Sequence, residues 1–269
     1  MSEHPYVFSS QADDRELDRL NQQARVIDPI TIRHLETIGV ENSWNCLEVG
    51  AGAGSIAQWL VTRVGSTGHV VATDIDLRFL SRLNAPNLEI RRHNIIRDDL
   101  ETNQYDVVHC RKMLHHVSDP ETAVQKMADA VRPGGWLLLE EDDWGSMLSA
   151  DVTEPSAAPF VATLRVLYDK LRKNGMVDYY FGRRVRGLIE GLGFTDVDQE
   201  GWTTMVHRSD PFANLYLSPE IWEAYRDNLA LAELCTPEQY EILRRVFVDT
   251  ELYYPFYTLF SAWGRKPEN

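Results

Sequence analysis

The sequence is poor in cysteine, and the few cysteines that it has are far apart. Among 269 residues there are three, Cys46, Cys110 and Cys235, so they are odd in number and widely spaced. This pattern excludes a disulfide framework and a cysteine-based zinc site. It is typical of buried thiols in a reducing compartment.

Positive charge is also scarce. Lysine and arginine number 27 against 41 acidic residues, which gives a formal net charge of −14. Nucleic-acid binding rests on basic side chains that neutralise phosphates, so this balance argues against a general nucleic-acid-binding protein and favours a small-molecule partner. One basic stretch, 183–186, is expected to form the solvated face of a helix.

Long apolar runs are absent as well. No stretch approaches the roughly 20 apolar residues that a membrane-spanning helix needs. Residues 1–5 lack both the basic and the apolar segment of a secretion signal. The sequence therefore predicts a cytoplasmic protein with no membrane span. Its 43% hydrophobic and 25% charged residues are typical of a globular protein.

From residue 45 to residue 141, short β-branched runs alternate with segments of helical periodicity. A run at 88–91 alternates apolar and polar residues, which suits the edge of a sheet. Asp119 and Pro120 begin one helix with a capping carboxylate and a proline in the first turn. This alternation predicts an α/β fold with a doubly wound parallel sheet. Its central strands are near-continuously apolar, as expected of strands covered on both faces, and lie at 46–49, 69–73, 105–110 and 136–139.

Beyond Glu141 the pattern becomes mostly helical. Two helices should begin at Ser218 and Thr236, because each is a hydroxyl cap followed by proline. The other predicted elements are helices at 157–173 and 183–191, and strands at 193–197 and 256–263.

Three glycines follow the first predicted strand and precede a helix. Gly50, Gly52 and Gly54 let a ligand approach the backbone, and the helix presents free N–H groups at its start. Their G-x-G-x-G spacing departs from the G-x-G-x-x-G of dinucleotide-binding enzymes. Asp74 ends the next strand, where a carboxylate can accept both hydroxyls of a ribose. Glu48 ends a buried strand and needs a partner, which favours a role in positioning the ligand.

Together with 105–108, 114–117 and 133–140, these residues resemble the class I S-adenosylmethionine-dependent methyltransferases. The resemblance is to the ubiquinone/menaquinone-biosynthesis-like group, which includes many small-molecule and natural-product methyltransferases. It implies a seven-stranded, mainly parallel sheet of order 3-2-1-4-5-7-6, with the last strand antiparallel and helical cap insertions. The expected segments are an N-terminal helical cap at 1–43, a cofactor-binding core at 44–142, a helical insertion or lid at 143–180, a core helix and strand at 181–202, a helical insertion at 203–254, and a final core strand and tail at 255–269.

The resemblance also assigns the cofactor, S-adenosylmethionine, to named residues. Asp74 would accept hydrogen bonds from the ribose hydroxyls, and Ile75 would pack on the adenine. Asn94 replaces an aspartate that in this family accepts the adenine amino group, and its amide oxygen could accept that bond instead. Arg111 would contribute backbone contacts near the methionine part. The implied cofactor-binding residues are Glu48, Gly50, Ala51, Gly52, Asp74, Ile75, Asn94, Ile95 and Arg111.

Methyl transfer from a sulfonium is an in-line displacement, so a base is needed only if the acceptor must lose a proton. His115 and His116 follow the fourth strand, whose end faces the expected crevice, and an imidazole there could act as that base. We expect at most one of them to face the site, with capping or packing as the alternative. The four acids at 140–143 cannot all be buried, so a solvated loop is expected. The alternative is that one of them orients a hydroxyl or amine acceptor.

The acceptor is expected to contact aromatic side chains, with plain core packing as the alternative. Trp144 follows the acidic run, and Tyr179 and Tyr180 fall where inserted helices often form a lid in this class. Oxygen, nitrogen and carbon acceptors stay open, natural-product and quinone-like molecules among them, and no metal is expected. Two further alternatives are a nicotinamide-dependent oxidoreductase and a cofactor-binding protein without methyl transfer, in which the nucleoside is a structural ligand or the helical cap dimerises. A homodimer through the helical cap is also open for the methyltransferase.

Overall fold

The computed structural model describes residues 13–151, 155, 157–175, 177–207, 209–217, 233–249 and 251–268. These residues fall into two compact units. The first unit contains the described residues of 1–141, 181–201 and 260–269, and the second unit those of 142–180 and 202–259.

A seven-stranded sheet is the framework, and its order is β3-β2-β1-β4-β5-β7-β6, as predicted. The pairs β1–β2, β2–β3, β1–β4 and β4–β5 are parallel. The end of β7 pairs with the beginning of β5 through Lys266 and Gly135, which makes β7 antiparallel, also as predicted. The strands are β1 Asn45–Val49, β2 His69–Asp74, β3 Leu88–Arg92, β4 Tyr105–Arg111, β5 Val131–Asp143, β6 Thr195–Val206 and β7 Tyr254–Arg265.

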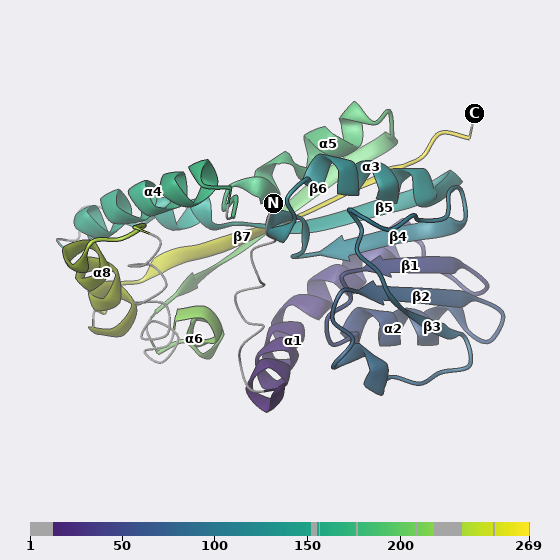
Figure 1. The fold of residues 1–269 in the computed structure, drawn as a ribbon, viewed down its shortest axis with the longest axis horizontal. Coiled ribbons are helices and arrows are strands. Elements are labelled where there is room, and N and C mark those ends of the chain that lie inside the picture. The colour runs from purple at the N-terminus through teal and green to yellow at the C-terminus, as the bar shows by residue number, and fades with distance from the viewer. Residues whose placement is uncertain are drawn as a thin grey trace. The chain divides into compact units, whose positions relative to one another are not determined.

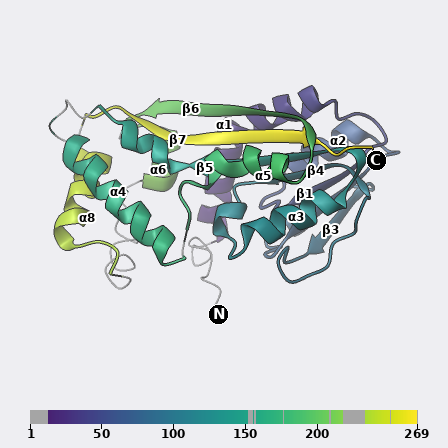
Figure 2. The same cartoon turned by 90° about the horizontal axis from the view of Figure 1, so that it is seen from above.

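Helices cover both faces of the sheet in the first unit (Figures 1 and 2). On one face, α1 Asp13–Ile38 and α2 Ser55–Val64 pack with apolar side chains of β1, β2, β4 and β5. On the opposite face, α3 Pro120–Ala130 and α5 Val185–Gly191 pack with the alternate side chains of the same strands. Successive side chains of a strand point to opposite faces, so near-continuously apolar strands need this double cover.

The predicted helix starts that the structure describes are confirmed. Asp119 accepts a hydrogen bond from the Thr122 N–H at 3.0 Å, ahead of Pro120 in α3. Thr236 and Gln239 form a reciprocal capping box at the start of α8 Pro237–Arg244. The predicted start at Ser218 lies outside the described residues. The remaining helical elements are α4 Ala157–Lys173, α6 Pro211–Leu217, the 3₁₀ turns Leu80–Arg82, Leu114–His116, Trp144–Ser149 and Phe181–Arg184, and the π-helical Arg245–Asp249.

The prediction for the four acids at 140–143 is wrong. Strand β5 continues to Asp143, and these four residues are 0 to 3% exposed. Burial is tolerated because side chains alternate along the strand, so consecutive acids reach different partners. Strands β6 and β7 are also longer than the predicted 193–197 and 256–263.

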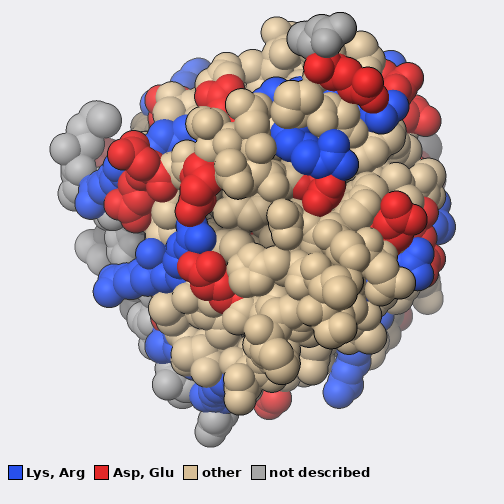
Figure 3. All heavy atoms as spheres, turned by 90° about the vertical axis from the view of Figure 1, so that its right-hand side faces the viewer, with Lys and Arg blue, Asp and Glu red and all other residues tan. Residues whose placement is uncertain are grey.

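Surface charge follows the expected pattern at the one basic stretch. Arg183, Arg184 and Arg186 are exposed while Val185 between them is buried. On the face in Figure 3, basic and acidic side chains lie interspersed among other residues. Among the helices in the described ranges, none has the length and apolar character to cross a membrane.

Candidate active site

The turn between β1 and α2 has the left-handed backbone that glycine permits. Gly50, Gly52 and Gly54 have φ values of 73°, 58° and 80°. A Cβ at Gly54 would lie 2.4 Å from Leu83 Cδ1 and 2.8 Å from Leu80 Cδ1, so a side chain there would have to displace both leucines. A Cβ at Gly52 would meet no described atom within 4 Å, so crowding does not explain this glycine. Its backbone is open to the close approach of a ligand.

Asp74 ends β2 beside this turn. Its Oδ2 accepts a hydrogen bond from the Gly52 N–H at 2.8 Å, and its Oδ1 accepts one from the Asp76 N–H at 2.9 Å. Burial raises the pKa of Asp74, and these two backbone donors oppose the rise. An ionised carboxylate offers about four lone-pair sites, so it can accept further donors such as ribose hydroxyls. The adjacent Ile75 is 57% exposed and presents an apolar surface beside that carboxylate.

Asn94 forms local hydrogen bonds after β3. Its Oδ1 accepts from the Ile96 N–H at 3.0 Å and from the Arg97 N–H at 3.2 Å. Its own N–H donates to Asp98 Oδ2 at 2.8 Å. Two bonds fill the two lone pairs of an amide oxygen, so this oxygen stabilises its own turn. The next residue, Ile95, is 5% exposed and belongs to the core.

The side chain of Arg111, at the end of β4, ties α1 to the sheet. Its guanidinium donates to Thr31 Oγ1 and to Asp28 Oδ1, both at 2.8 Å. Asp28 also accepts from Ser55 Oγ, at the start of α2, at 3.2 Å. The family resemblance predicted only backbone contacts between Arg111 and the cofactor. The side-chain contacts of Arg111 with α1 were not predicted.

Glu140 is the centre of a buried polar network on the α1 face. Its carboxylate is fully buried and its four partners match the lone-pair sites of a carboxylate. Burial alone would raise the pKa of Glu140, but hydrogen bonds from histidines hold it below its ordinary value. The four partners are Thr31 Oγ1, His34 Nδ1 at 3.1 Å, His109 Nε2 at 3.3 Å and Ser261 Oγ at 2.6 Å.

Glu48 is paired differently from Glu140. It lies opposite His109 in the register of β1 and β4, with Oε1 at 3.8 Å from His109 Nδ1. Within the described residues, its Oε2 has no hydrogen-bond partner. Burial raises the pKa of Glu48 to about 8, and Arg111 opposes the rise. A buried carboxyl atom without a protein partner suits a polar ligand group.

Glu141 binds the turn that follows β4 on the opposite face. Its Oε1 accepts hydrogen bonds from the N–H groups of Met113 and Leu114, at 2.8 and 2.7 Å. Its Oε2 lies 2.5 Å from Nδ1 of His115, which is 8% exposed. Burial raises the pKa of Glu141 to about 7, although the backbone donors oppose the rise. His116 is exposed, and its ring lies 3.9 Å from that of His115.

Sequence reasoning gave no role to His109, and it named Glu140 and Glu141 only within the acidic run, one member of which could orient the acceptor. Two signals were present. The apolar strand at 136–139 continues into the acids without a glycine or proline, which places consecutive carboxylates on opposite faces. The polar residues Asp28, Thr31 and His34 recur every three positions in α1, which places them on one side of the helix.

In the second unit, the three residues predicted to contact the acceptor lie together. Trp144 N–H donates to Tyr179 O at 2.8 Å, and the two rings are 5.6 Å apart. Tyr168 contacts both Tyr179 and Tyr180, at 4.9 and 6.0 Å. Among the described residues, the rings of Tyr216, Phe256 and Tyr257 also lie 5.0 to 5.5 Å from Trp144.

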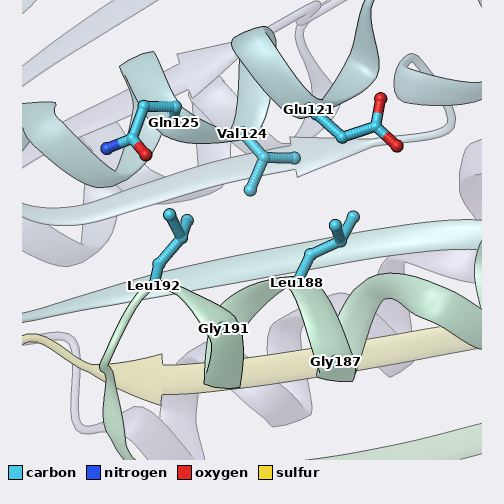
Figure 4. A pocket seen from close by; sticks show the side chains of 7 residues that line it. All are labelled: Glu121, Val124, Gln125, Gly187, Leu188, Gly191 and Leu192. Atoms are coloured by element: carbon cyan, nitrogen blue, oxygen red, sulfur yellow. The ribbon is translucent and has the colours of Figure 1, made fainter.

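A shallow groove of about 250 Å³ lies elsewhere, between α3 and α5 (Figure 4). Val124 faces Leu188 and Leu192 across it, and Glu121 and Gln125 lie at its α3 side. None of the described residues that line it was assigned to the cofactor or the acceptor. The groove is therefore separate from the candidate active site.

A family model described as a methyltransferase domain matches residues 11–199, more than half of the chain. A ubiquinone biosynthesis O-methyltransferase of Hydrogenovibrio crunogenus is 30% identical over 148 residues, which are 48% of this chain and 60% of that relative. The chain spans between 46% and 60% of the length of three curated relatives that it matches.

Two solved structures show the same fold. The phosphoethanolamine N-methyltransferase 2 of Haemonchus contortus in complex with S-adenosyl-L-methionine has a TM-score of 0.60 at 14% identity, over 99% of this chain and 60% of that one. The [4+2]-cyclase SpnF has a TM-score of 0.53 at 14% identity, over 90% of this chain and 81% of that one. With the glycine turn, the carboxylate after β2 and the family match, the chain belongs to the S-adenosylmethionine-dependent methyltransferases.

Proposed function

We propose that this protein transfers a methyl group from S-adenosylmethionine to a hydroxyl oxygen of a small aromatic molecule. The observation that carries the proposal is the contact between His115 and Glu141 at the end of β4. A phenolic hydroxyl is a better nucleophile once its proton has left, and a histidine held by a carboxylate can take that proton. The relative named as a ubiquinone biosynthesis O-methyltransferase supports an oxygen acceptor.

The described residues fit the cofactor at three points. The open backbone at Gly52 and the unpartnered Oε2 of Glu48 suit the methionine part, with Gly50, Ala51 and the backbone of Arg111 beside them. The spare lone pairs of Asp74 suit the ribose hydroxyls.

At the adenine end, the support is uneven. Ile75 offers an exposed apolar side chain, and Ile95 is a buried member of the core. For Asn94, the two backbone hydrogen bonds to its oxygen compete with the proposed bond from the adenine amino group. We therefore propose apolar packing as the main contribution of this chain to adenine binding.

The bound cofactor supplies an activated methyl group on a sulfonium, so the protein's contribution is alignment and proton removal. Ionised Glu141 accepts from Nδ1–H of His115, which leaves Nε2 as the basic nitrogen of the neutral ring. Nε2 then takes the hydroxyl proton of the acceptor. The two backbone N–H groups that hold Glu141 fix the direction of the imidazole. His116 is a second candidate base, but its side chain is exposed.

For the acceptor, we propose Trp144, Tyr179 and Tyr180 of the second unit. Aromatic rings bind planar aromatic molecules through stacked and edge-on contacts, and these three rings are half-buried within an aromatic cluster. This supports a phenolic or quinol-like acceptor over an aliphatic one.

A second function, cofactor binding without methyl transfer, is kept because one structure of this fold carries the name of a cyclase. Incubation with S-adenosylmethionine radiolabelled in the methyl group and a panel of phenols, catechols, amines and aliphatic alcohols separates the two. The proposal expects labelled product from a phenol or catechol. Label only on amines or alcohols would contradict the proposed acceptor, and binding of the cofactor with no labelled product across the panel would favour the second function.

A further inference from the structure

Glu48 and His109 face each other inside the first unit. They are register partners in adjacent parallel strands, so their side chains lie on the same face of the sheet. Glu48 is 5% exposed and His109 is fully buried. In the described part of the chain, neither Oε2 of Glu48 nor Nδ1 of His109 has a hydrogen-bond partner. The site described above gives a role to Oε2 of Glu48 and none to Nδ1 of His109.

Glu140 determines which nitrogen of His109 carries a proton. Its carboxylate is ionised and can only accept hydrogen bonds. His109 Nε2, at 3.3 Å from Glu140 Oε2, is therefore a protonated donor. Burial lowers the pKa of His109, and the hydrogen bond to Glu140 opposes this. A neutral ring with Nε2–H presents the lone pair of Nδ1 toward Glu48.

Two acceptors, Nδ1 of His109 and an ionised Glu48, would then face each other in a buried space. A proton on Glu48 removes this conflict, because the carboxyl is then neutral; its Oε1 lies 3.8 Å from Nδ1, which is longer than a hydrogen bond. Burial raises the pKa of Glu48 to about 8, which keeps that proton in place near neutral pH. The other groups that act on Glu48 are Arg111 of β4 and the N–H of Ala57 in α2, which favour its charge, and Asp28 of α1 and Asp74 of β2, which oppose it.

We propose that Glu48 holds a proton beside the neutral ring of His109 in the cofactor-free protein, and that binding of the cationic cofactor releases this proton to solvent. The proposal rests on the assignment of Glu48 to the cofactor site made above. The cofactor carries a sulfonium and an α-ammonium group, and a positive charge beside a carboxyl favours its ionised form. Only the O–H bond of Glu48 breaks, and the proton passes to the buffer. His109 is a positioning residue, since it acts through Glu48.

The test is isothermal titration calorimetry at about pH 7 in two buffers of different ionisation enthalpy, which counts the protons released on binding. S-adenosylmethionine and S-adenosylhomocysteine are the probes. Wild type should release between about half and one proton per S-adenosylmethionine bound, and no more than that per S-adenosylhomocysteine, whose thioether lacks the sulfonium charge. The Kd of wild type for S-adenosylmethionine should fall by up to about tenfold per pH unit between about pH 6 and 7.5. Glu48→Gln and His109→Gln should each release clearly less than wild type. His69→Gln, at the exposed start of β2, is the matched control and should release as many protons as wild type.

Glu48→Gln also corrects for any proton that the ligand's own amino group exchanges, since that exchange persists in the variant. Wild type without any proton release counts against the inference with no variant needed, so the test holds even where a variant fails to fold. Binding of both nucleosides by wild type without proton release, or equal release by wild type and Glu48→Gln, would overturn the inference and leave the proposed function standing. No binding of either nucleoside by wild type would instead overturn the proposed function, and the inference with it.

Discussion

Glu140 and Glu141 are consecutive, fully buried residues of β5 that point to opposite faces of the sheet. Glu140 meets side chains from α1, β4 and β7, and these fill its lone pairs. Glu141 meets two backbone N–H groups and one imidazole, all from the turn after β4. A carboxylate bound by side chains of distant elements holds those elements together. A carboxylate fixed by local backbone leaves its remaining oxygen to control the protonation of a histidine.

The largest expected effect is on the α1 face, from Glu140→Ala. The change removes the common partner of four buried polar groups, and breaking a buried ionic network costs about 3–5 kcal/mol. We expect the free energy of unfolding, measured by urea denaturation, to fall by that amount. Ser261→Ala removes one partner and should cost much less. A fall below about 1 kcal/mol for Glu140→Ala would mean that the network does not join α1 to the sheet.

On the face of the sheet that carries Glu141, we expect substitutions to change the rate of methyl transfer rather than the stability. His115→Gln removes the proposed base, and general-base catalysis contributes about 100-fold or more. We expect methyl transfer to fall by that factor while the Kd of the cofactor and the unfolding free energy change little. His116→Gln should give a smaller loss. Turnover of His115→Gln equal to wild type from about pH 6 to about pH 9 would remove His115 from the mechanism.

Substitution of Asp74 tests the cofactor site independently of Glu140 and Glu141. Asp74→Ala removes up to two charge-assisted hydrogen bonds to the ribose, each worth about 1.5–3 kcal/mol at best. Calorimetry should show at least about tenfold weaker binding of S-adenosylhomocysteine in a folded variant. Asp76→Ala, two residues along the same loop, is the control and should bind more tightly than Asp74→Ala. Unchanged affinity in Asp74→Ala would place the ribose elsewhere.

The smallest effect is expected at the exposed end of the α1 network. Arg33 makes two hydrogen bonds of 2.7 Å to Glu200, but the side chains are 53% and 40% exposed. Exposed pairs contribute about 0–1 kcal/mol, so Arg33→Ala should barely change the unfolding free energy. A loss as large as that of Glu140→Ala would show that stability is not concentrated in the buried part of the network.

Much of the fold was predictable because its signals are local. The apolar strands, the cap at Asp119 and the glycines at 50–54 each report their own neighbourhood, and a family resemblance supplied the sheet order. The extension of β5 through 140–143 was missed because composition alone assigns such acids to the surface. Their partners come from distant positions, such as His34 and Ser261, and sequence spacing does not reveal these contacts.

In the candidate site, too, the local features were predictable and the contacts between distant residues were not. Asp74 and the glycines follow from the strand–turn–helix pattern, whereas the pairing of His115 with Glu141 depends on the register of two parallel strands. Glu48 was expected to need a partner, and its register partner is a second titratable group, His109. The sequence therefore does not predict which titratable groups of the site become neighbours when the sheet forms.

The most direct test of the proposed chemistry is the pH dependence of methyl transfer in wild type and in Glu141→Gln. Burial raises the pKa of Glu141 to about 7, and its proton must leave before it can accept from Nδ1–H of His115. Wild-type turnover should therefore rise with pH through about 7. In Glu141→Gln, turnover should be lower and the pH of this rise should shift, because only the imidazole of His115 then has to lose a proton. A Glu141→Gln variant with wild-type turnover and the same rise would contradict the account.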